Sequence, residues 1–100
     1  MDPELSDIRI ADVVMATAGR EKGKLFYVLS IEENMLFLGN GKDRTLETPK
    51  RKKCKHVQKV LRSETRVAEK LRNGDKVLNS ELRRDLAFFS RDMQSNDLGG

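Results

Sequence analysis

Short β-type runs that alternate with turns at close intervals fill residues 12–60, and this spacing constrains the fold more than any other feature. In the first run, valine and alanine side chains alternate with methionine and threonine, which is the two-residue period of a strand. Asn40-Gly41 is a favoured hairpin turn because both residues tolerate a positive φ. The pattern predicts a mainly β domain, a small barrel of about five strands, over segments 12–18, 25–31, 35–38, 43–47 and 54–57.

Beyond residue 60 the apolar period changes from two to about 3.6, which indicates helix. One predicted helix covers 64–72 and ends before Gly74, a natural C-terminal stop. A second covers 80–90, with Asn79 as its N-cap and Glu81 in the first turn, where the helix dipole favours an acid. We therefore predict a C-terminal helical hairpin with a tight turn. Its apolar residues are expected to pack on the barrel or on each other: Val67, Leu71, Leu82, Leu86 and Phe89.

One hundred residues are enough for one domain with short appendages. We predict four segments: a flexible acidic lead-in at 1–9, the barrel at 10–60, a helical extension at 61–92 and a flexible tail at 93–100. No apolar run approaches the roughly 20 residues that span a bilayer, and the N-terminus lacks the basic start of a signal peptide. A lone cysteine cannot form an internal disulfide, so we expect a cytoplasmic protein without membrane contact.

Positive charge is concentrated in one stretch of the chain. Seven basic and no acidic residues lie in 50–62, whereas the whole chain carries a net charge of +4, so the remaining residues are acidic overall. This asymmetry directs one face of the molecule toward a polyanion. Five aromatic residues and no tryptophan are too few for a broad surface on which bases stack.

A strand, a basic Gly-x-x-x-Gly loop and a second strand follow one another over residues 14–29. This arrangement resembles the KOW motif. Ala18-Gly-Arg-Glu-Lys-Gly23 is similar to the loop of the ribosomal L-fourteen-e branch and of short bacterial KOW proteins described as RNA-binding. Pro49-Lys-Arg-Lys52 and Lys55-His-Val-Gln58 are similar to the basic tract and closing strand of those proteins. The resemblance covers about residues 12–59, and it implies an SH3-like barrel that binds ribosomal or messenger RNA or docks on the transcription machinery.

The glycine loop, Gly19–Gly23, is the first candidate binding element. Gly19 and Gly23 let the chain turn sharply and bring backbone N–H groups near a phosphate, although shaping a hairpin is their expected main role. Arg20, Lys22 and Lys24 supply positive charge at its rim, and Arg20 can hold a phosphate with two hydrogen bonds. We expect Arg20 and Lys22 to contact RNA.

The basic tract from Lys50 to Lys59 is the second candidate element. Charge runs are often only solvated surface, but this one has no compensating acid and is closed by an apolar cluster that ties it to the fold. For His56, a contact with a ribose or base and a structural role at the barrel edge both stay open. Cys54 is expected to be a small apolar strand residue. The expected contact residues of the tract are Lys50, Arg51, Lys52, Lys53, Lys55, His56 and Lys59.

These features favour non-catalytic binding of structured RNA, most plausibly ribosomal RNA, by a protein that is a monomer when free. The alternative is a protein-interaction adaptor for ribosomal or transcription proteins, in which apolar strands or helices make the contact. A nucleotide-binding P-loop is rejected, because Leu25 stands where Ser or Thr must reach magnesium. One histidine among cations offers no catalytic base with a partner, so we expect neither an enzyme nor a cofactor or metal site. DNA binding by the two helices is the weaker hypothesis, because the second helix carries acidic residues beside its arginines, whereas a recognition helix is normally more basic.

Overall fold

A computed structural model describes residues 7–99 of the chain, and the side chains of residues 7–93. It contains five strands: β1 (Asp12–Ala16), β2 (Leu25–Glu32), β3 (Met35–Gly39), β4 (Lys50–Lys53) and β5 (Val57–Arg62). A short 3-10 helix, η1 (Cys54–His56), joins β4 to β5, and two α-helices follow, α2 (Arg66–Asn73) and α3 (Asn79–Gly99).

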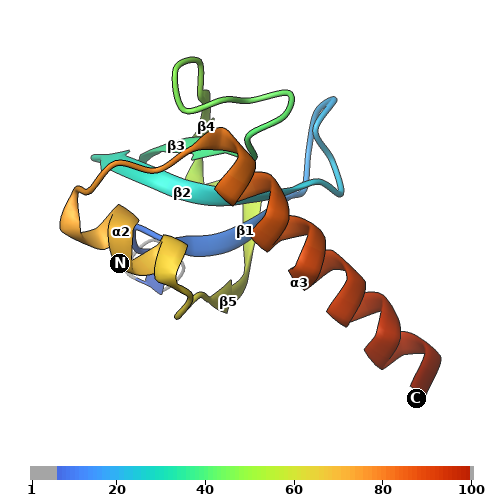
Figure 1. Cartoon of the computed structure of the whole chain (residues 1–100). Coiled ribbons are helices and arrows are strands. Elements are labelled where there is room, and N and C mark those ends of the chain that lie inside the picture. Colours follow the sequence, from blue (N-terminus) through green and yellow to red (C-terminus); the bar gives the residue numbers. More distant parts are fainter. Residues whose placement is uncertain (1–6, 100) are drawn as a thin grey trace.

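The strands form one antiparallel sheet in the order β4-β3-β2-β1-β5 (Figure 1). β1 therefore lies between β2 and β5, although β5 is the last of the five strands in the sequence. Asp12 pairs with Arg62 at one end of that ladder, and Ala16 pairs with Val57 at the other. The prediction of a mainly β domain with five strands and two later helices is confirmed at this level.

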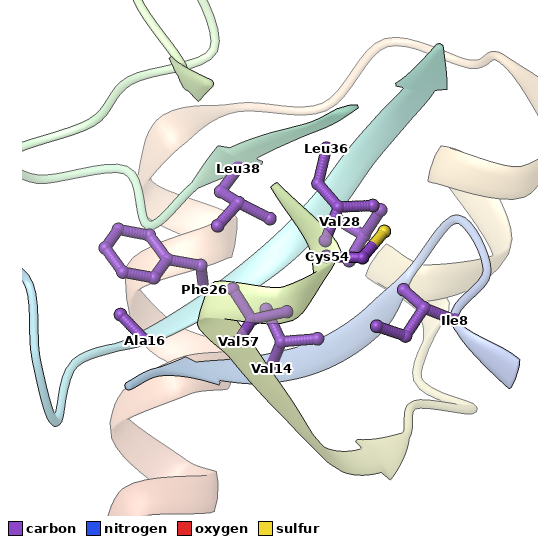
Figure 2. Packing of buried hydrophobic residues seen from close by; sticks show 9 residues of the cluster. All are labelled: Ile8, Val14, Ala16, Phe26, Val28, Leu36, Leu38, Cys54 and Val57. Carbon is purple, nitrogen blue, oxygen red and sulfur yellow. The ribbon is translucent and has the colours of Figure 1, made fainter. Parts of the chain in front are cut away.

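Both faces of the sheet are covered by apolar side chains, because neighbouring residues of a strand point to opposite sides. Val14 lies in one cluster and its neighbour Val13 in the other. The inner cluster gathers the side chains that point toward one another in Figure 2: Ile8, Val14, Ala16, Phe26, Val28, Leu36, Leu38, Cys54 and Val57. The opposite face of the sheet is covered by residues of the helices, chiefly Val67, Leu82 and Leu86.

Each helix has an identifiable start or stop. The Thr65 hydroxyl accepts a hydrogen bond from the Ala68 N–H at 3.2 Å and so caps α2, while Gly74 ends that helix in the left-handed conformation, as predicted. Glu81 accepts from the Leu78 N–H at 2.9 Å, which places Leu78 at the N-cap position. The prediction of Asn79 as N-cap was therefore wrong, because α3 begins at Asn79 and its side chain bonds elsewhere.

The helices do not form a tight hairpin. After the turn at Gly74, residues 75–78 have no regular structure and carry the chain across the sheet to the start of α3 (Figure 1). α3 packs its first turns against β2 and then extends away from the strands. The second helix is also longer than predicted, since it continues beyond residue 90 to Gly99 and includes most of the segment expected to be a flexible tail.

Two predicted strands were misplaced. Segment 43–47 is an irregular loop, whose conformation is fixed by side chains of α3 rather than by a strand ladder. Segment 54–57 is η1 followed by the first residue of β5, and the fourth strand is the basic run Lys50–Lys53 instead. Part of the lead-in is also packed: Ile8 is buried in the inner cluster, whereas residues 1–6 lie outside the described residues.

Candidate nucleic-acid interface

The glycine loop is a compact turn between β1 and β2. Gly19 and Gly23 have φ values of 78° and 90°, which favour glycine over any residue with a side chain. The Lys22 N–H donates to the Gly19 carbonyl at 3.2 Å, and the Gly23 N–H donates to the Ala16 carbonyl at 2.8 Å. Their predicted shaping role agrees with these angles and bonds, which leave the loop little conformational freedom.

Glu21 is the one buried member of the glycine loop. Its carboxylate lies 3.3 Å from a terminal nitrogen of Arg44, in the loop between β3 and β4. Because the central residue of the loop turns inward, Arg20 and Lys22 on either side of it are exposed. The structure thus places these two predicted contact residues at the surface, free of any hydrogen bond or ion pair to another described side chain.

The basic tract begins as an edge strand. β4 pairs only with β3, in a register that sets Lys52 opposite Leu36 and Arg51 opposite Phe37. Lys50 and Lys52 therefore share the face of the inner cluster, whereas Arg51 and Lys53 point to the other side and are exposed. Lysine on an edge strand also discourages pairing with a foreign strand, so part of this charge has a protective role that needs no ligand.

The residues that lead into the glycine loop contact the basic tract in the folded chain. The Lys52 ammonium donates to the Ala18 carbonyl at 3.0 Å, and the Thr17 N–H donates to the His56 carbonyl at 2.9 Å. Between them is a shallow cleft of about 520 Å³, here called the basic cleft. Five cations and no carboxylate line it; its lining residues are Ala18, Gly19, Met35, Lys50, Arg51, Lys52, Lys53, Lys55 and His56.

An arginine and an aromatic ring are paired beside the basic cleft. The guanidinium carbon of Arg51 lies over the Phe37 ring, 5.8 Å from its centroid. Such a pair holds the long arginine side chain in place by a cation–π contact. It also presents a planar guanidinium, which can bind a phosphate or stack on a base.

Two of the predicted contact residues, Lys24 and Lys59, form ion pairs with carboxylates of the fold. Lys24 forms an ion pair of 2.6 Å with Asp43, and that hydrogen bond lowers the pKa of Asp43 and raises the pKa of Lys24. Lys59 lies 3.3 Å from the buried carboxylate of Asp12 and donates to the Asp7 carbonyl at 3.0 Å. Neither side chain lines the basic cleft, and neither do Arg20, Lys22 and Gly23, so Gly19 is the one predicted contact residue of the glycine loop that lines it.

His56 lines the basic cleft with a half-buried side chain, while its backbone carbonyl joins η1 to the start of the glycine loop. Both roles left open by the sequence therefore remain compatible with its position. Cys54 is buried in the inner cluster, in agreement with the small apolar role predicted for it, although it lies in η1 and not in a strand.

Three residues that sequence reasoning missed hold the loop between β3 and β4. The Asn79 side chain accepts from the Leu46 N–H at 2.8 Å, and the Arg83 guanidinium donates to the Gly41 carbonyl at 2.6 Å. Arg44 extends this support to the glycine loop through Glu21. The one available signal was the presence of an acid inside an otherwise basic loop, which implied a partner for Glu21.

No protein-family model matches the chain, and no curated protein is similar to it in sequence. Within the described part of the chain, neither α-helix combines the length and apolar composition that crossing a bilayer requires. A group of three or more His, Cys, Asp and Glu side chains able to hold a metal ion does not occur among the described residues either.

Proposed function

We propose that this protein is a KOW-type module that binds structured RNA, ribosomal RNA first of all, without catalysing a reaction on it. One observation supports the proposal: five cations of the basic tract and no acid line one cleft, which Gly19 of the glycine loop, distant in sequence, also borders. Positive side chains that cannot neutralise one another keep their attraction for phosphates, and each phosphate that they neutralise releases counterions.

The fold supports this proposal as far as its topology goes. A KOW module is expected to be an SH3-like barrel of about five strands, and the chain has one antiparallel sheet of five strands with an apolar cluster on each face. The Gly-x-x-x-Gly loop that carries the resemblance connects β1 to β2 and borders the basic cleft. In this proposal the protein reads the shape and backbone of the RNA, because most side chains in the cleft are point charges.

The test is binding of ribosomal RNA fragments across a salt series, with a variant carrying Arg51→Ser, Lys53→Ser and Lys55→Ser. These side chains are exposed, and Lys52 is left unchanged because it bonds to Ala18. Each phosphate contact contributes about 0.7–0.9 to the slope of log affinity against log salt. We expect the variant to lose affinity at low salt and to reduce that slope by about 2.

A matched control carries Arg66→Ser, Lys76→Ser and Arg84→Ser, which remove the same charge from exposed positions on and between the helices. We expect the control to keep nearly the salt slope of the natural sequence. Equal losses in both triple variants would mean that net charge alone causes binding, and the cleft would be rejected as the site. Binding that is insensitive to salt would favour the adaptor, because apolar docking is not screened.

A further inference from the structure

A second hollow lies on the other side of the glycine loop. It has a volume of about 460 Å³ and is here called the helix groove, because α3 forms one of its walls. The loop between β3 and β4 and the last residues of the glycine loop form the others. Apolar and cationic side chains both line it, notably Leu25, Leu86, Ala87, Lys24, Lys42 and Arg83.

The walls of the helix groove are held together by contacts already in place. Gly41 approaches α3 so closely that a Cβ atom there would lie 2.1 Å from the Asn79 carbonyl oxygen. Arg83 bonds to the Gly41 carbonyl at 2.6 Å, and Asn79 donates to the Glu47 carboxylate at 3.0 Å. The groove is therefore preformed, so a ligand would not have to order its walls.

The glycine loop contributes one residue to the helix groove and one to the basic cleft. Gly19 lines the basic cleft and Gly23 lines the groove, while Arg20 and Lys22 are exposed between them. The two cations of the loop, Arg20 and Lys22, line neither hollow and lie between these two glycines in the sequence. The loop that carries the proposed interface is also a wall of the second hollow.

The charges and the apolar lining of the groove point to one kind of ligand. Lys24 and Asp43 neutralise each other, which leaves Lys42 and Arg83 as exposed cations. The Arg83 guanidinium donates one hydrogen bond to the described part of the protein, so further N–H donors remain for a phosphate. Leu25 and Ala87 offer a small apolar surface on which the flat face of an unpaired base can lie.

We propose that the helix groove holds an unpaired segment of the RNA whose neighbouring phosphates lie in the basic cleft. This inference rests on the proposed function and names the part of the RNA that is recognised. A base inside a regular duplex is stacked and paired and cannot enter the groove, whereas a base in a loop, bulge or overhang can. The protein then prefers RNA in which a duplex adjoins an unpaired run.

The test uses two probes: a short RNA duplex that carries an unpaired run of uridines, and the same duplex fully paired. Ser90 and Ser80 are both exposed on α3, but only Ser90 lines the groove. We expect the full chain to bind the probe with the unpaired run more tightly. Ser90→Glu should weaken that binding about fivefold through repulsion of a phosphate, and Ser80→Glu, the matched control, should change it little.

Ser90→Lys should tighten binding of the same probe, and this opposite sign separates an electrostatic effect from a loss of folding. Equal affinity of the full chain for both probes, or equal behaviour of Ser90→Glu and Ser80→Glu, would overturn the groove while salt-dependent binding to the basic cleft stands. Failure of the unaltered protein to bind either probe, while ribosomal RNA fragments still bind, would overturn the groove alone; failure to bind the fragments as well would reject the proposed function, and the groove with it.

Discussion

The side chain of Tyr27, in β2, links the sheet to the helices through hydrogen bonds of its hydroxyl. Its hydroxyl donates to the Asp85 carboxylate of α3 at 2.6 Å and lies 2.9 Å from the Ser63 hydroxyl. Thr65, the cap of α2, donates to the same carboxylate oxygen at 2.6 Å. Burial and the bond to Asp85 raise the pKa of Tyr27 to about 12. Because the phenol is neutral in this network, ionising it removes a hydrogen-bond donor from the half-buried carboxylate of Asp85.

The raised pKa of Tyr27 predicts how stability changes in alkali. An unfolded tyrosine ionises near its ordinary pKa of 10, so between pH 10 and about 12 the unfolded chain holds fewer protons than the folded one. The contribution to stability is fully present below pH 10 and falls as the pH rises through this window. Tyr27→Phe should remove that share of the alkaline decline, as measured by urea unfolding across pH.

Tyr27 is the single tyrosine of a chain without tryptophan, so tyrosinate absorbance reports its ionisation directly. A midpoint near pH 10 in the folded protein would contradict the network. Tyr27→Phe should also lower the free energy of unfolding by about 1–3 kcal/mol at neutral pH, since Asp85 loses a hydrogen-bond donor.

For single residues, the sequence predicted the secondary-structure element better than the hydrogen-bond or ion-pair partner. The alternation of β2 placed Tyr27 in a strand, yet nothing near it in sequence indicates Asp85, which follows more than fifty residues later. Lys24 and Lys59 were counted as free cations for the same reason. Their acidic partners, Asp43 and Asp12, come from other elements and are brought close only by folding.

Among the elements, the loop between β3 and β4 links α3 to the glycine loop. Asn79 and Arg83 fix it from the side of the helix, and Arg44 carries the contact on to Glu21. The alternation of charge with Thr and Leu at 43–47 imitates a strand, but these residues form no ladder. Local pattern failed there because bonds to a helix much later in the chain determine the conformation.

Arg44→Met tests that linkage. The substitution leaves the Glu21 carboxylate buried without its cationic partner, so we expect the free energy of unfolding to fall by about 1–3 kcal/mol. Amide exchange of the glycine loop should become faster, and affinity for RNA should fall, because Arg20 and Lys22 are no longer held outward. Lys42→Met, in the same loop but exposed, is the matched control for stability and exchange. Equal exchange rates in the two variants would show that Arg44 does not order the glycine loop.

Over the whole molecule, the same strands supply two apolar clusters, one on each face of the sheet. The number of strands and the order of strands before helices were predictable from period and turns alone. The side on which the helices pack was not, because both faces of β1 and β2 are apolar and the sequence carries no mark of which one is closed by α2 and α3.

Because the same strands contribute to both apolar clusters, we predict that the protein unfolds in one cooperative transition. Leu36 and Leu82 are fully buried on opposite faces, so Leu36→Ala and Leu82→Ala should each cost about 2–5 kcal/mol. Tyrosine fluorescence and far-ultraviolet circular dichroism should report the same midpoint in both variants. Two separated transitions in Leu82→Ala would show that the helices fold and melt independently of the sheet.

The pairing of β1 with β5 has a consequence for a chain that is made from its N-terminus. β1 emerges from the ribosome early, but its second neighbour in the sheet is synthesised only after η1, and α3 comes later still. Until then β1 has an unpaired backbone edge, and Val13 and Tyr27 have no helix over them. The growing chain therefore passes through a partly folded state that exposes a strand edge and apolar side chains. Slow translation or delayed release prolongs this state and gives it time to associate with other nascent chains.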